Sequence, residues 1–134
     1  MAAGKYNFII EQGATLDFEI QYKDSSGNPV DLTGYTAKME VRSAYSGSGT
    51  TYLSFTSSLG DTYTKTSGSS FISLSGSNLT TLPTSGSIGI YAGWDLTETL
   101  TFTGQAFYDL ELTNGDVRNR ILEGKVEISK QVTD

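Results

Sequence analysis

The sequence predicts an all-β protein, a single immunoglobulin-like antiparallel β-sandwich of about seven to nine strands. Polar and apolar side chains alternate with period two over several segments, as in strands with one buried face. Turn-forming residues, among them many of the 15 glycines, separate these segments. Asn114-Gly115 is the strongest hairpin signal, because both residue types accept the positive φ of a type I′ turn. Two packed sheets follow, with alternate residues in a shared core.

Three strands are expected between Tyr6 and Arg42. Phe8 and Ile10 share one face of the first strand, and residues 24–29 supply the turn residues that reverse the chain after the second. The apolar positions of the second and third strands alternate with polar ones; they are Leu16, Phe18, Ile20 and Tyr22, then Tyr35, Ala37, Met39 and Val41. This third of the chain carries strand patterns and no catalytic motif.

The middle of the chain is less regular. Residues 43–50 are rich in Ser and Gly and predict a loop, while residues 62–70 fit either a loop or an edge strand. Three shorter strands are expected here, over residues 51–56, 71–74 and 87–92. All three are bounded by turn residues, so none of the connections divides the chain into two domains.

Residues 94–103 allow two interpretations. Asp95 can cap a helix start, and Glu98 stands at the reciprocal position of a capping box, which predicts a short helix near Asp95. Against this, threonines at 97, 99, 101 and 103 alternate with Leu100 and Phe102, as in a strand. Both interpretations stay open at this point.

The C-terminal third predicts a long hairpin. Ala106, Tyr108, Leu110 and Leu112 alternate with polar residues up to the Asn114-Gly115 turn, and the return strand runs over residues 117–132. At 134 residues the chain is of the usual size for one domain, so residues 1–134 are expected to form a single β-sandwich, with 1–5 as a flexible N-terminal arm.

Composition argues against several functions. A net charge of −6 disfavours nucleic acid as a partner, because binding a phosphate backbone needs clustered Lys and Arg. The absence of Cys and His removes thiolate sites, the commonest general base and the commonest zinc ligand, so we expect no enzyme, no metal site and no cofactor. No window reaches the length of a membrane span and no secretion signal is readable, so no membrane partner is expected.

Few residues suggest a site. The carboxylate pairs Asp17 and Glu19, Asp109 and Glu111, and Glu123 and Glu127 lie on outward strand faces, where solvated charge is the ordinary interpretation and a glycosidase pair a remote one. Asp24, Asn28 and Asp31 fit turn chemistry far better than a calcium loop. Five aromatic residues have no clear place in the core and are the candidate contact surface: Tyr45, Tyr52, Tyr63, Trp94 and Phe107.

Several segments together resemble a family. They are Gly4-Lys5-Tyr6-Asn7-Phe8, Glu11 to Thr15, the turn over 24–29, Asp31 to Thr36, Tyr108 to Leu112, and Leu122 to Val126. In these segments the chain resembles small β-sandwich structural proteins of tailed bacteriophages and, more distantly, the N-terminal domains of phage baseplate upper proteins. The resemblance covers residues 4–42 and 105–133, and residues 43–104 match no family.

The resemblance implies a non-enzymatic virion component, assembled in the host cytoplasm, that binds other virion proteins and copies of itself. A tail, baseplate or neck subunit is the leading hypothesis, and a capsid decoration protein on the head surface is the alternative. From a different class, a carbohydrate-binding module that recognises a host-surface glycan through Tyr and Trp fits the aromatic residues. A carboxylate hydrolase ranks third.

Overall fold

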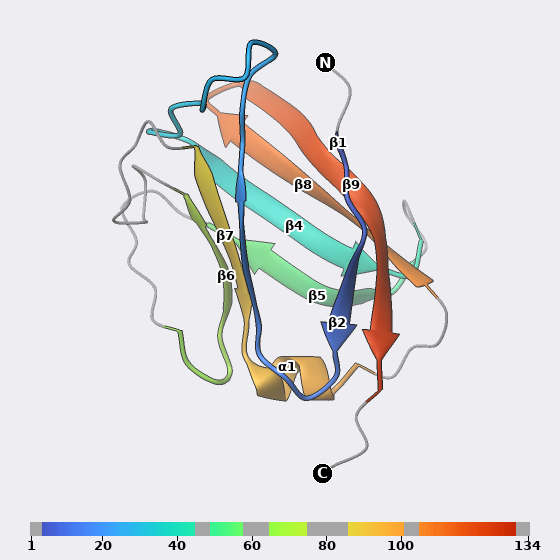
Figure 1. The fold of residues 1–134 in the computed structure, drawn as a ribbon. Helices are drawn as coiled ribbons and strands as arrows, with labels where there is room; N and C mark the ends of the chain where they lie inside the picture. The colour runs from blue at the N-terminus through green and yellow to red at the C-terminus, as the bar shows by residue number, and fades with distance from the viewer. Residues whose placement is uncertain (1–3, 45–48, 58–64, 75–85, 101–104, 131–134) are drawn as a thin grey trace.

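The computed structural model describes residues 4–44, 49–57, 65–74, 86–100 and 105–130. Within these ranges the chain forms nine strands and one short helix (Figure 1). The strands are β1 Gly4–Lys5, β2 Phe8–Glu11, β3 Leu16–Gln21, β4 Thr36–Arg42, β5 Thr51–Thr56, β6 Ser70–Leu74, β7 Ser87–Ala92, β8 Gln105–Asn114 and β9 Val117–Ser129. The helix is α1, Trp94–Glu98.

The strands form two sheets packed face to face, which confirms the predicted all-β sandwich (Figure 1). The larger sheet has the order β1-β9-β8-β4-β5, with β2 continuing β1 along β9, and the smaller has the order β3-β7-β6. One edge differs from the expected antiparallel pattern, since β1 and β2 both pair parallel with β9. Gly4 and Lys5, expected in a flexible arm, lie in this edge.

The core lies between the sheets and is made by the alternating residues that the sequence pattern predicts. Both inner faces contribute fully buried side chains, among them Met39, Phe55 and Leu110 from the larger sheet and Ile72, Ile88 and Ile90 from the smaller. Burying such a side chain contributes about 1.5–3 kcal/mol relative to leaving it in water. This shared core fixes the register of both sheets, because a slip by one residue would turn the apolar side chains to solvent.

The long hairpin of β8 and β9 lies where the sequence predicts, but its two turn residues are Gly115 and Asp116, since Asn114 pairs with Val117 in the ladder. Gly115 has φ 62° and no described residue other than glycine has a positive φ, so the turn is of type II′ and the predicted type I′ turn over Asn114-Gly115 is wrong. The ladder shifts register between Leu110 and Glu111, so that Ile121 has no partner of its own on β8. An extra residue of this kind is a β-bulge, which bends the strand and increases its twist.

The two long sides of the sandwich differ. On one side β5 of the larger sheet lies next to β6 of the smaller, and the Ser70 hydroxyl donates to the Ser54 carbonyl at 3.0 Å. On the other side β1 and β2 face β3, and the contact is made through aromatic rings. The Phe8 ring lies 5.3 Å from the Phe18 ring and 4.9 Å from the Tyr108 ring, centroid to centroid. This second side leaves two strand edges without a neighbour among the described strands.

The helical interpretation of residues 94–98 is confirmed, but its predicted cap is wrong. Gly93 is the N-cap residue and makes no side-chain cap hydrogen bond. Asp95 instead accepts the Gly68 N–H at 2.7 Å, because the approach of residues 67 and 68 brings that donor closer than the amides of the helix. Residues 101–104, part of the rival strand interpretation, lie outside the described residues.

Thr97 links this helix by hydrogen bonds to the loop between β2 and β3. Its side chain is fully buried, and its hydroxyl donates to the Ala14 carbonyl at 2.8 Å while accepting the Gly13 N–H at 3.1 Å. Without the hydroxyl, the Gly13 N–H and the Ala14 carbonyl, both partly buried, would lose this partner.

Thr97→Val should therefore lower the free energy of unfolding by about 1–3 kcal/mol, since shape is kept and two backbone groups lose their partner. Thr99→Val is the matched control, because the Thr99 hydroxyl is exposed and should change stability by less than about 0.5 kcal/mol. Urea unfolding followed by circular dichroism measures both. Equal midpoints for the two variants would contradict this account of Thr97.

Candidate functional site

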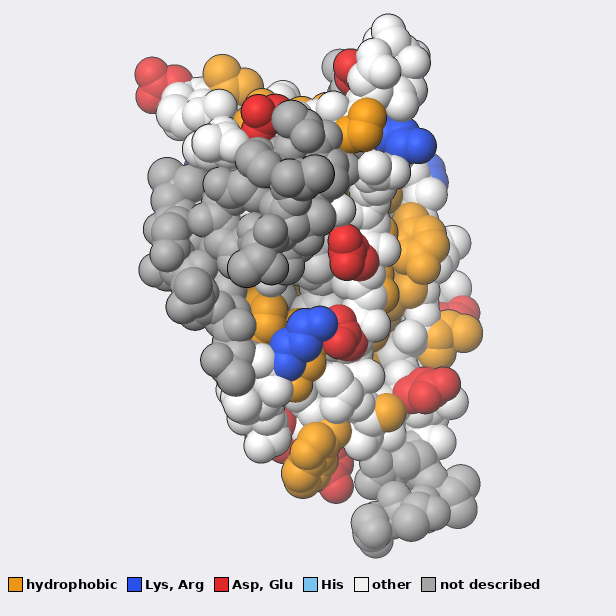
Figure 2. Space-filling model, turned by 60° about the vertical axis from the view of Figure 1, so that its left-hand side comes forward, with side chains coloured by type: hydrophobic (Ala, Val, Ile, Leu, Met, Phe, Trp, Pro, Cys, Tyr) orange, Lys and Arg blue, Asp and Glu red, His pale blue; other side chains and the backbone are white. Residues whose placement is uncertain are grey.

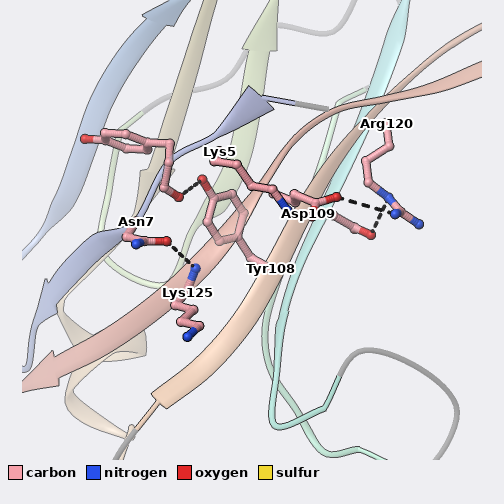
Figure 3. Close-up of polar contacts among 8 residues, drawn as sticks. Lys5, Asn7, Tyr108, Asp109, Arg120 and Lys125 are labelled. Atoms are coloured by element: carbon pink, nitrogen blue, oxygen red, sulfur yellow. Dashed lines mark hydrogen bonds and ion pairs between the residues drawn. The ribbon is translucent and has the colours of Figure 1, made fainter. Parts of the chain in front are cut away.

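The N-terminal edge of the larger sheet is held by an exchange of hydrogen bonds at Tyr6 and Asn7. The Tyr6 N–H donates to the Glu123 carbonyl at 3.0 Å, as in a regular parallel ladder. The next rung differs, because the Lys125 N–H donates to the side-chain Oδ1 of Asn7 at 2.9 Å (Figure 3). The Tyr6 carbonyl accepts the hydroxyl of Tyr108 instead, at 2.5 Å. One backbone rung is thus replaced by two side-chain hydrogen bonds.

Gly124 makes this exchange possible. It stands opposite Tyr108 in the β8–β9 register, so the Tyr108 side chain reaches Tyr6 past a position without a Cβ. A Cβ on Gly124 would lie 2.8 Å from the Tyr6 carbonyl carbon and 2.9 Å from Asn7 Oδ1, both too close for real contacts. We call these five residues, Tyr6, Asn7, Tyr108, Gly124 and Lys125, the edge latch.

The Tyr108 hydroxyl keeps the proton that it donates in this hydrogen bond. The residue is 3% exposed, and burial, followed by electrostatic interaction with Tyr6, raises the pKa of its hydroxyl well above the ordinary value. The hydroxyl therefore stays protonated throughout the physiological range. This hydrogen bond of the edge latch joins a neutral hydroxyl to a backbone carbonyl, so its strength does not depend on surface charge.

Ion pairs outside the latch tie the same three strands. Lys5 on β1 pairs with Glu123 on β9, and Arg120 pairs with Asp109 at 3.2 Å and with Glu123 at 3.6 Å (Figure 3). The hydrogen bond from Lys5, together with Arg120, holds the pKa of Glu123 below its usual value. Two of the outward carboxylates of the sequence pattern therefore serve as partners for strand-edge cations.

A groove runs along the open side of the sandwich, between the N-terminal edge and β3. Its upper recess, of about 1110 Å³, is lined by Gly4 and Tyr6, by β3 and the residues after it up to Lys23, and by residues 118–123 of β9. Its lower recess, of about 610 Å³, shares Tyr6 and lies between β2 and residues 15–18. We call the two recesses together the side groove. Figure 2 shows apolar side chains along the right of the molecule, with Lys or Arg side chains above them and carboxylates lower down.

The charges that line the side groove differ between its ends. Lys23, Arg118 and Arg120 line the upper recess, with Glu123 as its one carboxylate, and among the described residues neither Lys23 nor Arg118 has a recorded ion pair. Glu11 and Asp17 line the lower recess. Asp17 pairs with the exposed Lys65 at 3.0 Å. Because the net charge of the whole chain is −6, the positive charge at the upper recess differs in sign from the average charge of the surface.

This geometry favours binding of another chain. The groove offers strand edges, exposed apolar side chains and separated charges, which are the elements of a protein–protein contact. Within the part of the chain that the structure describes, no group of three or more metal-binding side chains occurs. The oxygens of Asp24 and Asp31 accept turn N–H groups, from Ser26 and Asn28 and from Thr33. The Thr33 N–H also lowers the pKa of Asp31.

The three predicted contact residues that the structure describes lie on three different elements. Trp94 is 49% exposed at the start of α1, Tyr52 is half-buried on β5 against the core, and Phe107 is half-buried on β8 beside a small recess. Tyr45 and Tyr63 lie outside the described residues. None of the three described residues lines the side groove.

Sequence reasoning missed the residues that do line the groove. Tyr6 and Ile9 are 46% and 60% exposed. One signal was readable, since three consecutive apolar residues at 8–10 in a strand require that the middle one face away from the core. Arg118 and Arg120 form a basic i,i+2 pair in an acidic chain, which was a second signal.

Gly124→Ala should lower the free energy of unfolding by about 1–3 kcal/mol, because the new Cβ displaces the Tyr6 backbone. Gly89→Ala on β7 is the matched control, since its Cβ would meet Ser73 Cβ at an ordinary 3.6 Å. Chemical denaturation of both variants measures the difference. If Gly124→Ala were as stable as Gly89→Ala, the edge latch would not be close-packed.

Tyr108→Phe should cost about 1–2 kcal/mol, because the Tyr6 carbonyl loses its donor. The cost should depend on pH. With a folded-state pKa raised above the unfolded value of about 10, Tyr108 contributes stability that is complete below pH 10 and declines as pH rises further, by up to about 1.4 kcal/mol per pH unit. Unfolding measured from about pH 8 to about pH 11, that is, from two units below the unfolded pKa to one unit above it, should show the wild type losing stability faster than Tyr108→Phe. Parallel pH profiles would contradict the buried neutral donor.

Comparison with known proteins adds no relative. No protein-family model matches the chain, and no match to a curated protein was found. Among the described residues, no helix has the length and apolar character needed to cross a membrane. The functional proposal therefore depends on the residues of this chain and on their arrangement.

Proposed function

We propose that this protein is a non-enzymatic structural subunit of a tailed bacteriophage virion, located in the tail, baseplate or neck. It acts through contacts with other virion proteins and with copies of itself. One observation carries the proposal: the segments that resemble phage β-sandwich proteins include every residue of the edge latch. Residues from both ends of the chain, which carry the resemblance, thus meet in one stabilised sheet edge.

The physical properties of the sandwich support this role. A subunit repeated in a particle needs a rigid framework and surfaces for neighbours. Here strands far apart in sequence pack into one core, while on the open side two strand edges have no neighbour among the described strands. The side groove adds apolar and charged groups at that same side. A capsid decoration protein on the head surface would need the same properties and is the alternative location.

A host-glycan module is the candidate from another class, and exposed Trp94 favours it. Sugars stack on exposed aromatic rings, and Trp94 is the most exposed ring among the described tryptophan and tyrosine residues. Against this, Tyr52 is partly packed against the core and lies on β5, away from α1 in the chain. Trp94 and Tyr52 thus lie on separate elements rather than side by side on one strand.

Purified particles test the proposal. Quantitative mass spectrometry of intact virions should find this protein at a fixed copy number, in stoichiometry with tail, baseplate or neck proteins. Particles of a strain that lacks the gene should lack a defined substructure in electron micrographs. A wild-type strain grown and purified in parallel is the control.

The opposite result is equally specific. If the protein is absent from washed particles, and the isolated protein binds host polysaccharide in a manner abolished by Trp94→Ala, the structural proposal is wrong and the glycan module is supported. If its copy number instead matches that of the major head protein, the alternative location on the capsid surface is supported.

A further inference from the structure

The outer edge of β3 faces no other described strand, so a strand of another chain can pair with it. The Tyr22 N–H donates to the Gly86 carbonyl at 2.8 Å, which fixes the direction of the hydrogen-bonding groups along the strand. Because this direction alternates from residue to residue, the N–H and C=O groups of Asp17, Glu19 and Lys23 point away from β7 and toward the side groove. Among the described strands, β7 is the one neighbour of β3. Such an edge is a template for strand addition.

The opposite wall of the side groove is unusually apolar for an exposed edge. Four large hydrophobic residues are exposed in the described part of the chain, and two of them, Tyr6 and Ile9, lie on this wall. The Tyr6 ring lies 6.4 Å from the Phe18 ring across the groove. Exposed apolar side chains beside unpaired strand edges favour a covered rather than a solvated surface.

The charges along the side groove are arranged so that one groove complements another turned end for end. The upper recess has three cations against one carboxylate, and the lower recess has Glu11 and Asp17, of which Asp17 also pairs with Lys65. A two-fold rotation about an axis across the middle of the groove places each end against the opposite end of a second copy. Self-complementarity of this kind is what an isologous dimer requires.

We propose that a second copy of this chain docks along the side groove, with β3 pairing antiparallel to β3 of the second copy. The register that sets Ile20 opposite Ile20 of the second copy sets Asp17 opposite its Lys23. In that register the outward backbone groups of both strands face one another. This inference rests on the proposed function of a self-associating subunit and names the surface that is used.

A second copy fits the groove better than other partners. An acidic peptide would meet favourable charge at Arg118 but repulsion from Glu11 and Asp17 at the other end, and a glycan has no use for a strand edge. A second copy of this chain places an opposite charge against each end of the groove. These partners remain distinguishable by experiment, because only a second copy gives a complex of the pure protein with itself.

Charge exchange tests the dimer. The full chain at high concentration and low salt should sediment as a dimer in analytical ultracentrifugation. Lys23→Glu with Arg118→Glu should weaken association about tenfold or more, because like charges then face each other at both ends. Glu11→Lys with Asp17→Lys should do the same. An equal mixture of the two variants should form a heterodimer, because negative charges on one chain then face positive charges on the other at both ends of the groove.

Restored association also proves that each variant is folded. The matched control is Lys38→Glu with Lys130→Glu, which makes the same change in net charge as Lys23→Glu with Arg118→Glu. Lys38 on β4 and Lys130 just after β9 are exposed, line neither recess and are not part of the edge latch, so the dimer should stay intact. A monomeric wild type, a dimer unaffected by both groove variants, or a mixture that stays monomeric would overturn the proposal. A monomer that is nevertheless present in purified particles would overturn this interface alone and leave the proposed function standing.

Discussion

The hydrogen bond from the Tyr108 hydroxyl to the Tyr6 carbonyl joins three neighbouring strands at one point. It starts on β8, passes β9 at Gly124 and ends on the N-terminal edge segment. The rung that Tyr6 gives up is replaced by Asn7, so no donor is left unpaired at Lys125. The N-terminal edge is thereby held in a fixed position, and the side groove, the aromatic contact to β3 and the exposed residues of that edge depend on it.

A fixed edge has consequences on both of its faces. Inward, Phe8 packs on Tyr108 and Phe18, so that the open side is bridged by rings rather than by a strand. Outward, Ile9 and Tyr6 are presented to solvent in a defined geometry. A wall that is rigid, apolar and bordered by charge is already arranged for contact, which limits the conformational entropy lost when a neighbour binds. The stability of this edge and the association proposed for it would in this way depend on the same few residues.

Much of the framework could be predicted from the sequence. Alternation over 16–22, 35–41 and 106–112 identified strands whose apolar residues are buried or partly buried in the core. Asn114-Gly115 identified the hairpin, although its turn lies one residue later, at Gly115-Asp116. The parallel pairing of β1 and β2 could not be predicted, because period two is the same for parallel and antiparallel strands. The prediction that Asp95 caps the helix was wrong, because the backbone N–H of Gly68, distant in sequence, binds its carboxylate instead. The groove was missed because it joins residues from the two ends of the chain, and aromatic type alone does not report exposure.

Hydrogen exchange of the native protein, resolved by residue, tests the central claim most directly. If the edge latch holds the N-terminal edge as part of the cooperative core, the amides of Tyr6 and Lys125 should exchange with a free energy close to that of global unfolding, like the amides of β4. Exchange of these two amides at the rate of an exposed, unpaired strand end, while β4 stays protected, would contradict the account.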